Sequence, residues 1–122
     1  MGELEATVRH LEGASIIDLE GEIDIAAEAM LRGAYANAAS RGRAMIVLNF
    51  DRVRYLNSSG IALIVELLAR ARTERRTVAA FGLVDHFREI FQITRLTDFM
   101  AIYPDEDSAL SGAPAPANKE GR

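Results

Sequence analysis

Between residues 44 and 93 the chain alternates short apolar runs with longer amphipathic segments. Residues 44–50 and 77–83 are apolar runs without clean polar alternation, which is typical of strands covered on both faces of a sheet. Residues 59–72 and 84–93 instead repeat apolar side chains at spacings of three and four, as amphipathic helices do. Because strands and helices alternate along the chain, the sequence predicts an α/β sheet with right-handed crossovers.

The remaining predicted elements are strands over 4–10, 15–24 and 99–103, and a short helical turn that begins near residue 105. Asp24 is a good N-cap for a helix over 25–41, and Gly42 is expected to end that helix. The apolar face of the helix over 59–72 is expected to consist of Ile61, Ile64, Val65, Leu68 and Ala71, widened by Leu63 and Leu67.

The length of the chain predicts one domain. Its 122 residues, 49% of them hydrophobic, are enough to bury a sizeable core. We place this domain at residues 1–110. Residues 111–122 contain Gly, Pro and small or charged residues with little to bury, so we expect a disordered C-terminal tail there.

The composition argues against several classes of protein. The net charge of −4 leaves no basic excess to neutralise phosphates, so nucleic-acid binding is not expected. The chain has no cysteine, which rules out disulfides, thiolate metal sites and a cysteine nucleophile. No apolar run approaches the roughly 20 residues of a membrane span, and the N-terminal segment is too acidic for a signal peptide. A cytoplasmic location is therefore expected.

The residues Asn57-Ser58-Ser59-Gly60 lie where a strand is predicted to end and a helix to begin. A nucleophilic serine in a strand-to-helix elbow needs a glycine two residues before it and another two residues after it, and neither serine has both. The two histidines, at positions 10 and 86, are not in a pattern typical of a general base. No metal-ligand spacing and no phosphate-binding glycine motif is present, so we expect no catalytic residues, no metal and no cofactor.

Two interpretations of this segment remain open from the residues alone. In the first, Asn57 or Ser58 caps the helix and the segment has no regulatory role. In the second, a serine in the first helical turn accepts a phosphate. Unpaired backbone N–H groups and the positive end of the helix dipole would favour such an anion. Both interpretations can hold at once.

The segment "MIVLNFDRVRYLNSSGIALIVELLARAR" (45–72) resembles the signature of STAS domains, and specifically of bacterial anti-sigma factor antagonists. The segments "LEGEID" (19–24), "VAAFGLVDHFREIFQITRL" (78–96) and "FMAIYPDEDSAL" (99–110) agree with this resemblance in the same order. The likeness covers roughly residues 4–110. It implies an α/β STAS fold with one mixed four- to five-stranded sheet and helices packed mainly on one face.

The resemblance implies a non-enzymatic switch protein in stress-response transcription. In that family the unphosphorylated domain binds an anti-sigma factor, which is also a serine kinase of the histidine-kinase-like ATPase fold, and so frees a sigma factor. The kinase phosphorylates the serine directly before the glycine, here Ser59, and a PP2C-type phosphatase removes the phosphate. Members often have Asp where this chain has Asn57, which keeps the capping geometry but removes a negative charge beside the phosphoacceptor.

The surface around Ser59 is where we expect a partner to bind. The residues expected to contact it are Asp24, Tyr55, Asn57, Ser58 and Gly60. Asp24 is first a helix cap and second a contact, and Tyr55 is expected in a charged loop over 51–57. Weak homodimerisation is left open. An alternative function with the same fold is a scaffold unit, or a subunit beside a membrane lipid transporter, that binds a partner without phosphorylation.

Overall fold

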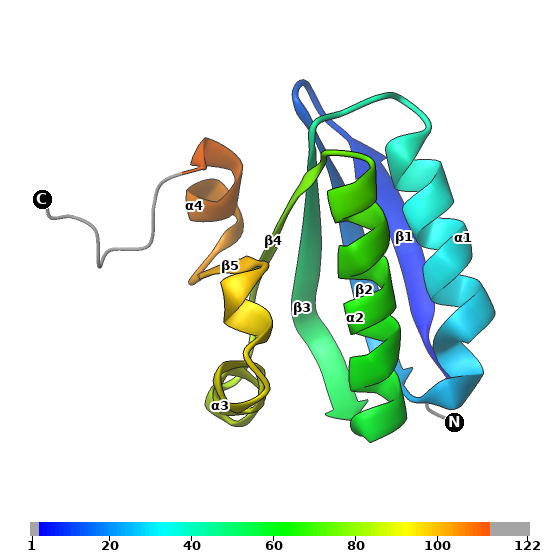
Figure 1. Cartoon of the computed structure of the whole chain (residues 1–122), viewed down its shortest axis with the longest axis vertical. Coiled ribbons are helices and arrows are strands. Elements are labelled where there is room, and N and C mark those ends of the chain that lie inside the picture. The colour runs from blue at the N-terminus through cyan, green and yellow to red at the C-terminus, as the bar shows by residue number, and fades with distance from the viewer. Residues whose placement is uncertain (1–2, 113–122) are drawn as a thin grey trace, which may run out of the picture.

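The computed structural model describes residues 3–112, and its centre is a five-stranded sheet (Figure 1). The strands are β1 (Glu5–His10), β2 (Ala14–Ile23), β3 (Met45–Leu56), β4 (Thr77–Phe81) and β5 (Ala101–Tyr103). The helices are α1 (Glu28–Ala39), α2 (Ser58–Thr73), α3 (Asp85–Ile93) and α4 (Glu106–Ser111), with 3-10 turns η1 (Ile25–Ala27) and η2 (Leu96–Asp98). The strands lie in the order β1-β2-β3-β4-β5. Only β1 is antiparallel to its neighbour, and the other pairs are parallel.

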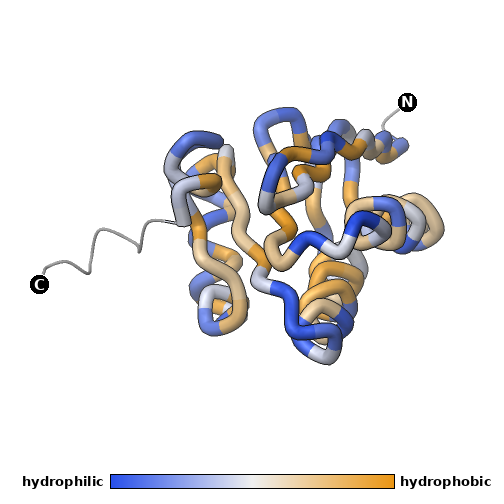
Figure 2. The backbone as a smooth tube through the Cα atoms, turned by 90° about the horizontal axis from the view of Figure 1, so that it is seen from above, coloured by the Kyte–Doolittle hydropathy of each residue, from blue (hydrophilic) through white to orange (hydrophobic). Residues whose placement is uncertain are grey.

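Side chains alternate between the two faces of this sheet, and each face has its own core. The larger core lies under α1, α2 and α3, where Tyr35, Phe50 and Phe91 are fully buried. The rings of Phe50 and Phe91 meet edge to face with their centroids 5.6 Å apart. On the opposite face α4 covers a smaller cluster formed by Ile16, Val47, Ala79, Phe81, Tyr103 and Ala109. Figure 2 shows hydrophobic residues along the strands and hydrophilic ones in the connecting turns. The predicted mixed α/β sheet, with helices mainly on one face, is confirmed.

Arg9 of β1 connects α4 to the sheet. Its guanidinium donates hydrogen bonds to the carboxylate of Asp18 in β2 at 2.6 and 2.9 Å. The same group donates to Glu106 of α4 at 2.8 and 3.2 Å. The side-chain amide of Asn49 in β3 donates a further bond to Asp18 at 2.7 Å. Burial acts to raise the pKa of Asp18, but the hydrogen bonds from Arg9 and Asn49 outweigh it and lower that pKa below its ordinary value.

The strand β3 is longer than predicted. The loop expected over 51–57 is wrong for residues 51–56, because β3 continues to pair with β2 as far as Leu56, opposite Ile23. Val53 and Leu56 are buried, whereas the charged residues Asp51, Arg52 and Arg54 face solvent, so the segment does not look like a strand in the sequence. The register between β2 and β3 shifts twice, near Asp18 and near Gly21, as happens at a β-bulge.

The apolar face of α2 is also displaced from the predicted one. The buried residues of this helix are Gly60, Leu63, Ile64, Leu67, Leu68 and Ala71. Val65, predicted to face the core, is 46% exposed. Ile61 is only partly buried. Leu63 and Leu67 are also separated by helical spacing, and they lie on the face of α2 that packs against the sheet.

Several element boundaries differ from the sequence prediction by a few residues. The helix expected over 25–41 begins as the turn η1 and ends at Ala39, followed by Gly42 with a positive φ of 68°. The strand expected over 77–83 ends at Phe81, because the next residue, Gly82, has φ of 80°. The strand expected over 99–103 begins only at Ala101. Ser111 ends α4 and Gly112 caps it. The rest of the predicted tail, 113–122, lies outside the described residues.

Candidate functional site

The turn between β3 and α2 packs against the carbonyl group of Ile23 at the end of β2. Gly60 lies so close to β2 that a Cβ at this position would be 1.9 Å from the carbonyl oxygen of Ile23. The backbone N–H of Asn57 donates to that same oxygen at 3.4 Å. Only glycine permits this approach, so Gly60 is required by packing and is buried beneath the surface rather than exposed on it.

Asn57 is the N-cap of α2. Its Oδ1 accepts a hydrogen bond from the N–H of Gly60 at 2.9 Å, and its carbonyl oxygen accepts one from Ile61 at 2.9 Å. Ser58 is therefore not the cap but the first residue of the helix. In the described part of the chain, the backbone N–H groups of Ser58 and Ser59 donate no hydrogen bond. These two N–H groups, at the positive end of a helix of 16 residues, can interact with an anion.

The two serine hydroxyls differ in accessibility. Ser58 is exposed, whereas Ser59 is half-buried. Neither hydroxyl forms a hydrogen bond with any residue between 3 and 112. A phosphate added to either hydroxyl would therefore break no side-chain hydrogen bond within the described residues.

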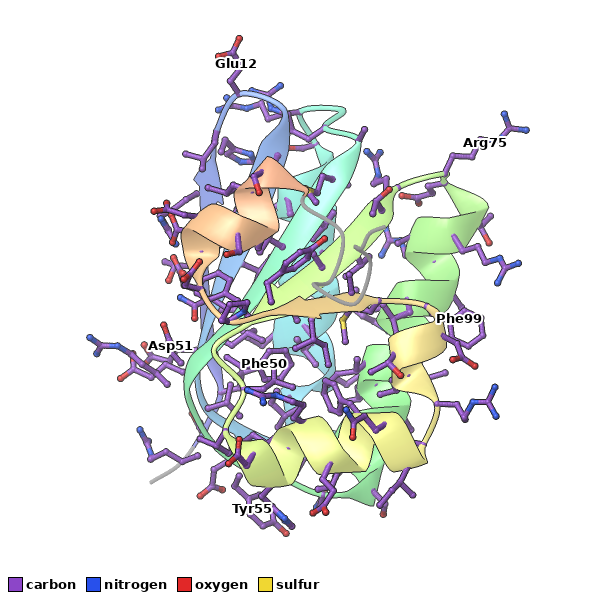
Figure 3. All side chains as sticks on the ribbon, turned by 90° about the vertical axis from the view of Figure 1, so that its left-hand side faces the viewer. Glu12, Phe50, Asp51, Tyr55, Arg75 and Phe99 are labelled. Atoms are coloured by element: carbon purple, nitrogen blue, oxygen red, sulfur yellow. The ribbon has the colours of Figure 1, made fainter. Side chains whose placement is uncertain are left out.

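Asp24, Ile25 and Tyr55 lie at the same end of the sheet as the serines. The Oδ1 of Asp24 accepts the N–H of Ala26 at 3.0 Å, which confirms Asp24 as a cap, here of the turn η1. That turn contacts α2. Tyr55 is 46% exposed near the end of β3, opposite Glu22, and so belongs to a strand and not to the predicted loop. In Figure 3 it projects from the end of the molecule where α3 lies.

We call the group Asp24, Ile25, Tyr55, Asn57, Ser58 and Ser59 the Ser59 surface. It joins an acidic side chain, an exposed tyrosine, the two serines and an exposed isoleucine. Ile25 is 65% exposed. Sequence reasoning missed Ile25 as a surface residue, because an isoleucine at the start of an amphipathic helix is expected to face the core.

Among the residues that the structure describes, neither histidine forms a hydrogen bond with Ser58 or Ser59. His10 interacts with Ser15 and Asn37, at 3.0 and 3.2 Å, near the start of β2. Ile23, at the serine end of β2, is eight residues from Ser15, about 26 Å along a strand. His86 is exposed on α3, where its ring lies 6.0 Å from that of Phe87. Among residues 3–112, no three His, Asp or Glu side chains are grouped so as to hold a metal ion.

A sequence model of the family described as "Mlab, STAS domain" matches residues 6–103. The chain belongs to the STAS domain family. The match includes all five strands from Ala6 onward and the whole of α2, so it covers the turn that holds Ser59. In the described part of this STAS domain, no helix is both long enough and apolar enough to cross a membrane.

Three relatives of this STAS domain extend over most of its length. BtrV of Bordetella bronchiseptica, provisionally assigned as an anti-sigma factor antagonist, is 25% identical and covers 92% of this chain and 94% of its own. The crystal structure of an anti-sigma factor antagonist from Mycobacterium paratuberculosis has a TM-score of 0.78 at 21% identity, covering 90% and 93%. The Bacillus cell fate determinant SpoIIAA, in its phosphorylated form, has a TM-score of 0.66 at 22% identity, covering 88% and 97%. The two structures establish that the fold is shared.

Proposed function

We propose that this STAS domain is an anti-sigma factor antagonist whose unphosphorylated form binds an anti-sigma factor through the Ser59 surface. The observation that carries the proposal is the state of Ser59, whose hydroxyl has no hydrogen-bond partner among the described residues at the open start of α2. The relationship to BtrV supports it, because that relative aligns with almost the whole chain. The protein would act by binding, without catalysis of its own.

We propose further that phosphorylation of Ser59 switches this binding off. A phosphoserine carries about −1.5 to −2 charges at neutral pH. The unpaired N–H groups of Ser58 and Ser59 would interact favourably with that charge, so the fold itself would tolerate it. A partner docked on the Ser59 surface would instead meet a bulky dianion beside Asp24. A loss of about 3–4 kcal/mol of binding free energy weakens a complex by roughly a few hundredfold to a thousandfold.

The proposed partners follow from this cycle. The anti-sigma factor would itself be the serine kinase, of the histidine-kinase-like ATPase fold, and would modify Ser59 while bound. A PP2C-type phosphatase would restore the free hydroxyl. SpoIIAA has been solved in a phosphorylated form, which supports a phosphorylation cycle on the same fold. Asn57 in this chain keeps the cap without placing a carboxylate beside the phosphate.

A second candidate function is a STAS subunit or scaffold that binds its partner without phosphorylation, for example beside a membrane lipid transporter. The description of the matching family, "Mlab, STAS domain", is the observation that favours it. The Ser59 surface would then be a constitutive contact, and the free hydroxyls would remain unmodified.

Phosphorylation with a purified anti-sigma serine kinase and ATP, followed by intact mass spectrometry, separates these proposals. We expect wild type and Ser58→Ala to gain one phosphate and Ser59→Ala to gain none. Phosphorylation that persists in Ser59→Ala and disappears in Ser58→Ala would move the site to the more exposed serine. A stable complex with a transporter ATPase, together with no phosphorylation by any cellular kinase, would favour the second function instead.

A further inference from the structure

A groove lies between the second half of α2 and the turn η2, away from the Ser59 surface. Its volume is about 540 Å³. The buried side chains of Leu68 and Val78 form its apolar floor. Val65, 46% exposed, and Phe99, 55% exposed, stand at its rim. Two large apolar side chains thus remain in solvent beside an apolar floor.

The same groove is lined by three arginines, Arg72, Arg75 and Arg76. Arg76 is engaged by the protein, through Glu74 at 3.3 Å and the carbonyl oxygen of Arg43 at 2.7 Å. Arg72 and Arg75 have no carboxylate partner in the part of the chain that is described. The guanidinium of Arg72 lies 5.7 Å from the ring centroid of Phe99.

Arg75 is an exposed residue in the turn after α2. It has φ of 62°, in the left-handed region, at the turn that follows α2. In Figure 3 it projects into solvent on the same side of the molecule as Phe99. The one acidic side chain among the described residues that line the groove, Asp98, is already paired with Arg95 at 2.9 Å. The groove is therefore positive, although the whole chain has a net charge of −4.

We propose that this groove binds an acidic peptide segment of a partner protein, with an apolar side chain flanked by Asp or Glu. The apolar residue would contact Leu68, Val78 and Phe99, and the flanking carboxylates would pair with Arg72 and Arg75. Arginine suits this role, because its planar guanidinium can bind a carboxylate in a bidentate manner and stack on an aromatic ring at once. The net charge of the chain disfavours nucleic acid as the occupant.

Binding in the groove is independent of the phosphorylation proposed for Ser59. Ser59 and Arg72 are thirteen residues apart on α2, which corresponds to about 20 Å at the rise of an α-helix. Charges on the protein surface are screened over about 8 Å at physiological ionic strength. A phosphate on Ser59 therefore leaves the affinity of the groove unchanged, so a partner can stay attached here after release from the Ser59 surface.

The test is selection of a random peptide library, displayed on phage, on the full-length chain. The selected peptides are then titrated by fluorescence anisotropy. Wild type is compared with four variants: the double variant Arg72→Gln/Arg75→Gln, Phe99→Ala, Ser59→Asp, and the matched control Arg52→Gln/Arg54→Gln. The control removes the same charge from two exposed arginines of β3 that lie outside the groove.

We expect enrichment of peptides in which Leu or Phe lies between Asp or Glu residues. Their affinity should fall about tenfold in Arg72→Gln/Arg75→Gln, since each exposed ion pair contributes up to about 1 kcal/mol. Phe99→Ala should weaken them as well, and the Arg52→Gln/Arg54→Gln control and Ser59→Asp should not. Enrichment without acidic residues, or equal affinity for the groove variants and the control, overturns the proposal. An absence of peptide enrichment also overturns the proposal. It does so whether or not phosphatidylglycerol vesicles bind to wild type more tightly than to the groove variants.

Discussion

The carbonyl oxygen of Ile23 would lie 1.9 Å from a Cβ placed on Gly60. That oxygen also accepts the N–H of Asn57 at 3.4 Å, so one peptide group of β2 contacts the chain on both sides of Ser58 and Ser59. The end of β2 continues directly into Asp24 and the turn η1. The position of the two serines relative to Asp24 is therefore set by the contact between Gly60 and Ile23.

Replacement of Gly60 by alanine should destabilise the protein by about 2–3 kcal/mol, because the added methyl group meets rigid backbone and not a flexible side chain. The matched control is Gly33→Ala in the middle of α1, where a Cβ would meet no atom within 4 Å beyond the neighbouring backbone of its own helix. That change should stabilise the protein by about 0.5–1 kcal/mol. Urea denaturation of both variants measures the difference. Equal stability of Gly60→Ala and wild type would contradict the close approach.

Asn57→Ala should cost about 1 kcal/mol of stability, because it removes the hydrogen bond from the N–H of Gly60 to the side chain. Asn57→Asp should retain most of that stability, since a carboxylate also accepts the bond. Ser58→Ala should change the free energy of unfolding little, because the hydroxyl has no partner in the described residues. If chemical denaturation shows Ser58→Ala to be as damaging as Asn57→Ala, the assignment of Asn57 as the cap is wrong.

Ser59→Asp should leave the melting temperature nearly unchanged while it weakens binding of the anti-sigma factor. A carboxylate in the first turn of α2 interacts favourably with the helix dipole, worth about 0.3–1 kcal/mol. Thr73→Asp is the control at the other end of the same helix, where the substitution also removes the hydrogen bond from the Thr73 hydroxyl to the carbonyl oxygen of Ala69 at 3.1 Å. There the same charge should destabilise the protein by a comparable amount and leave binding intact. Calorimetry and a binding titration give both quantities. Strong unfolding of Ser59→Asp would show that the serine is a structural residue.

The α/β architecture and the location of the serine turn could be predicted from the sequence, because both depend on local patterns. Apolar runs marked β3 and β4, and polar cap residues marked the start of α2. The extension of β3 through residues 51–56 could not be predicted, because pairing with β2 stabilises a segment whose exposed positions are charged. The buried face of α2 could be predicted only in part. Apolar residues recur at helical spacing both through Val65 and through Leu63, and only packing against the sheet determines which of the two faces is buried.

The role of Gly60 and the groove beside Phe99 depend on contacts between residues distant in the sequence. A glycine after a serine pair is compatible with an ordinary turn, and only the distance to Ile23 shows why a side chain is excluded. In the structure Arg70 and Arg76 of the segment 70–76 are paired with Glu74, whereas Arg72 and Arg75, which line the groove together with Arg76, have no carboxylate partner among the described residues.

The ion pair between Arg9 and Asp18 should make stability depend on pH in the acidic range. Hydrogen bonds from Arg9 and Asn49 outweigh burial and hold the pKa of Asp18 below its ordinary value of 3.8. The unfolded chain therefore binds this proton more readily. The stabilising contribution of Asp18 is present above about pH 4 and is lost as the pH falls through the lower, folded-state pKa. Asp18→Asn should thus cost more stability near pH 7 than near pH 3, measured by denaturation at both values.

The control is Glu12→Gln, at the exposed turn between β1 and β2 (Figure 3), which should leave stability near pH 7 unchanged. A cost of Asp18→Asn that is the same at both pH values would show that the carboxylate of Asp18 contributes no charge-dependent stability.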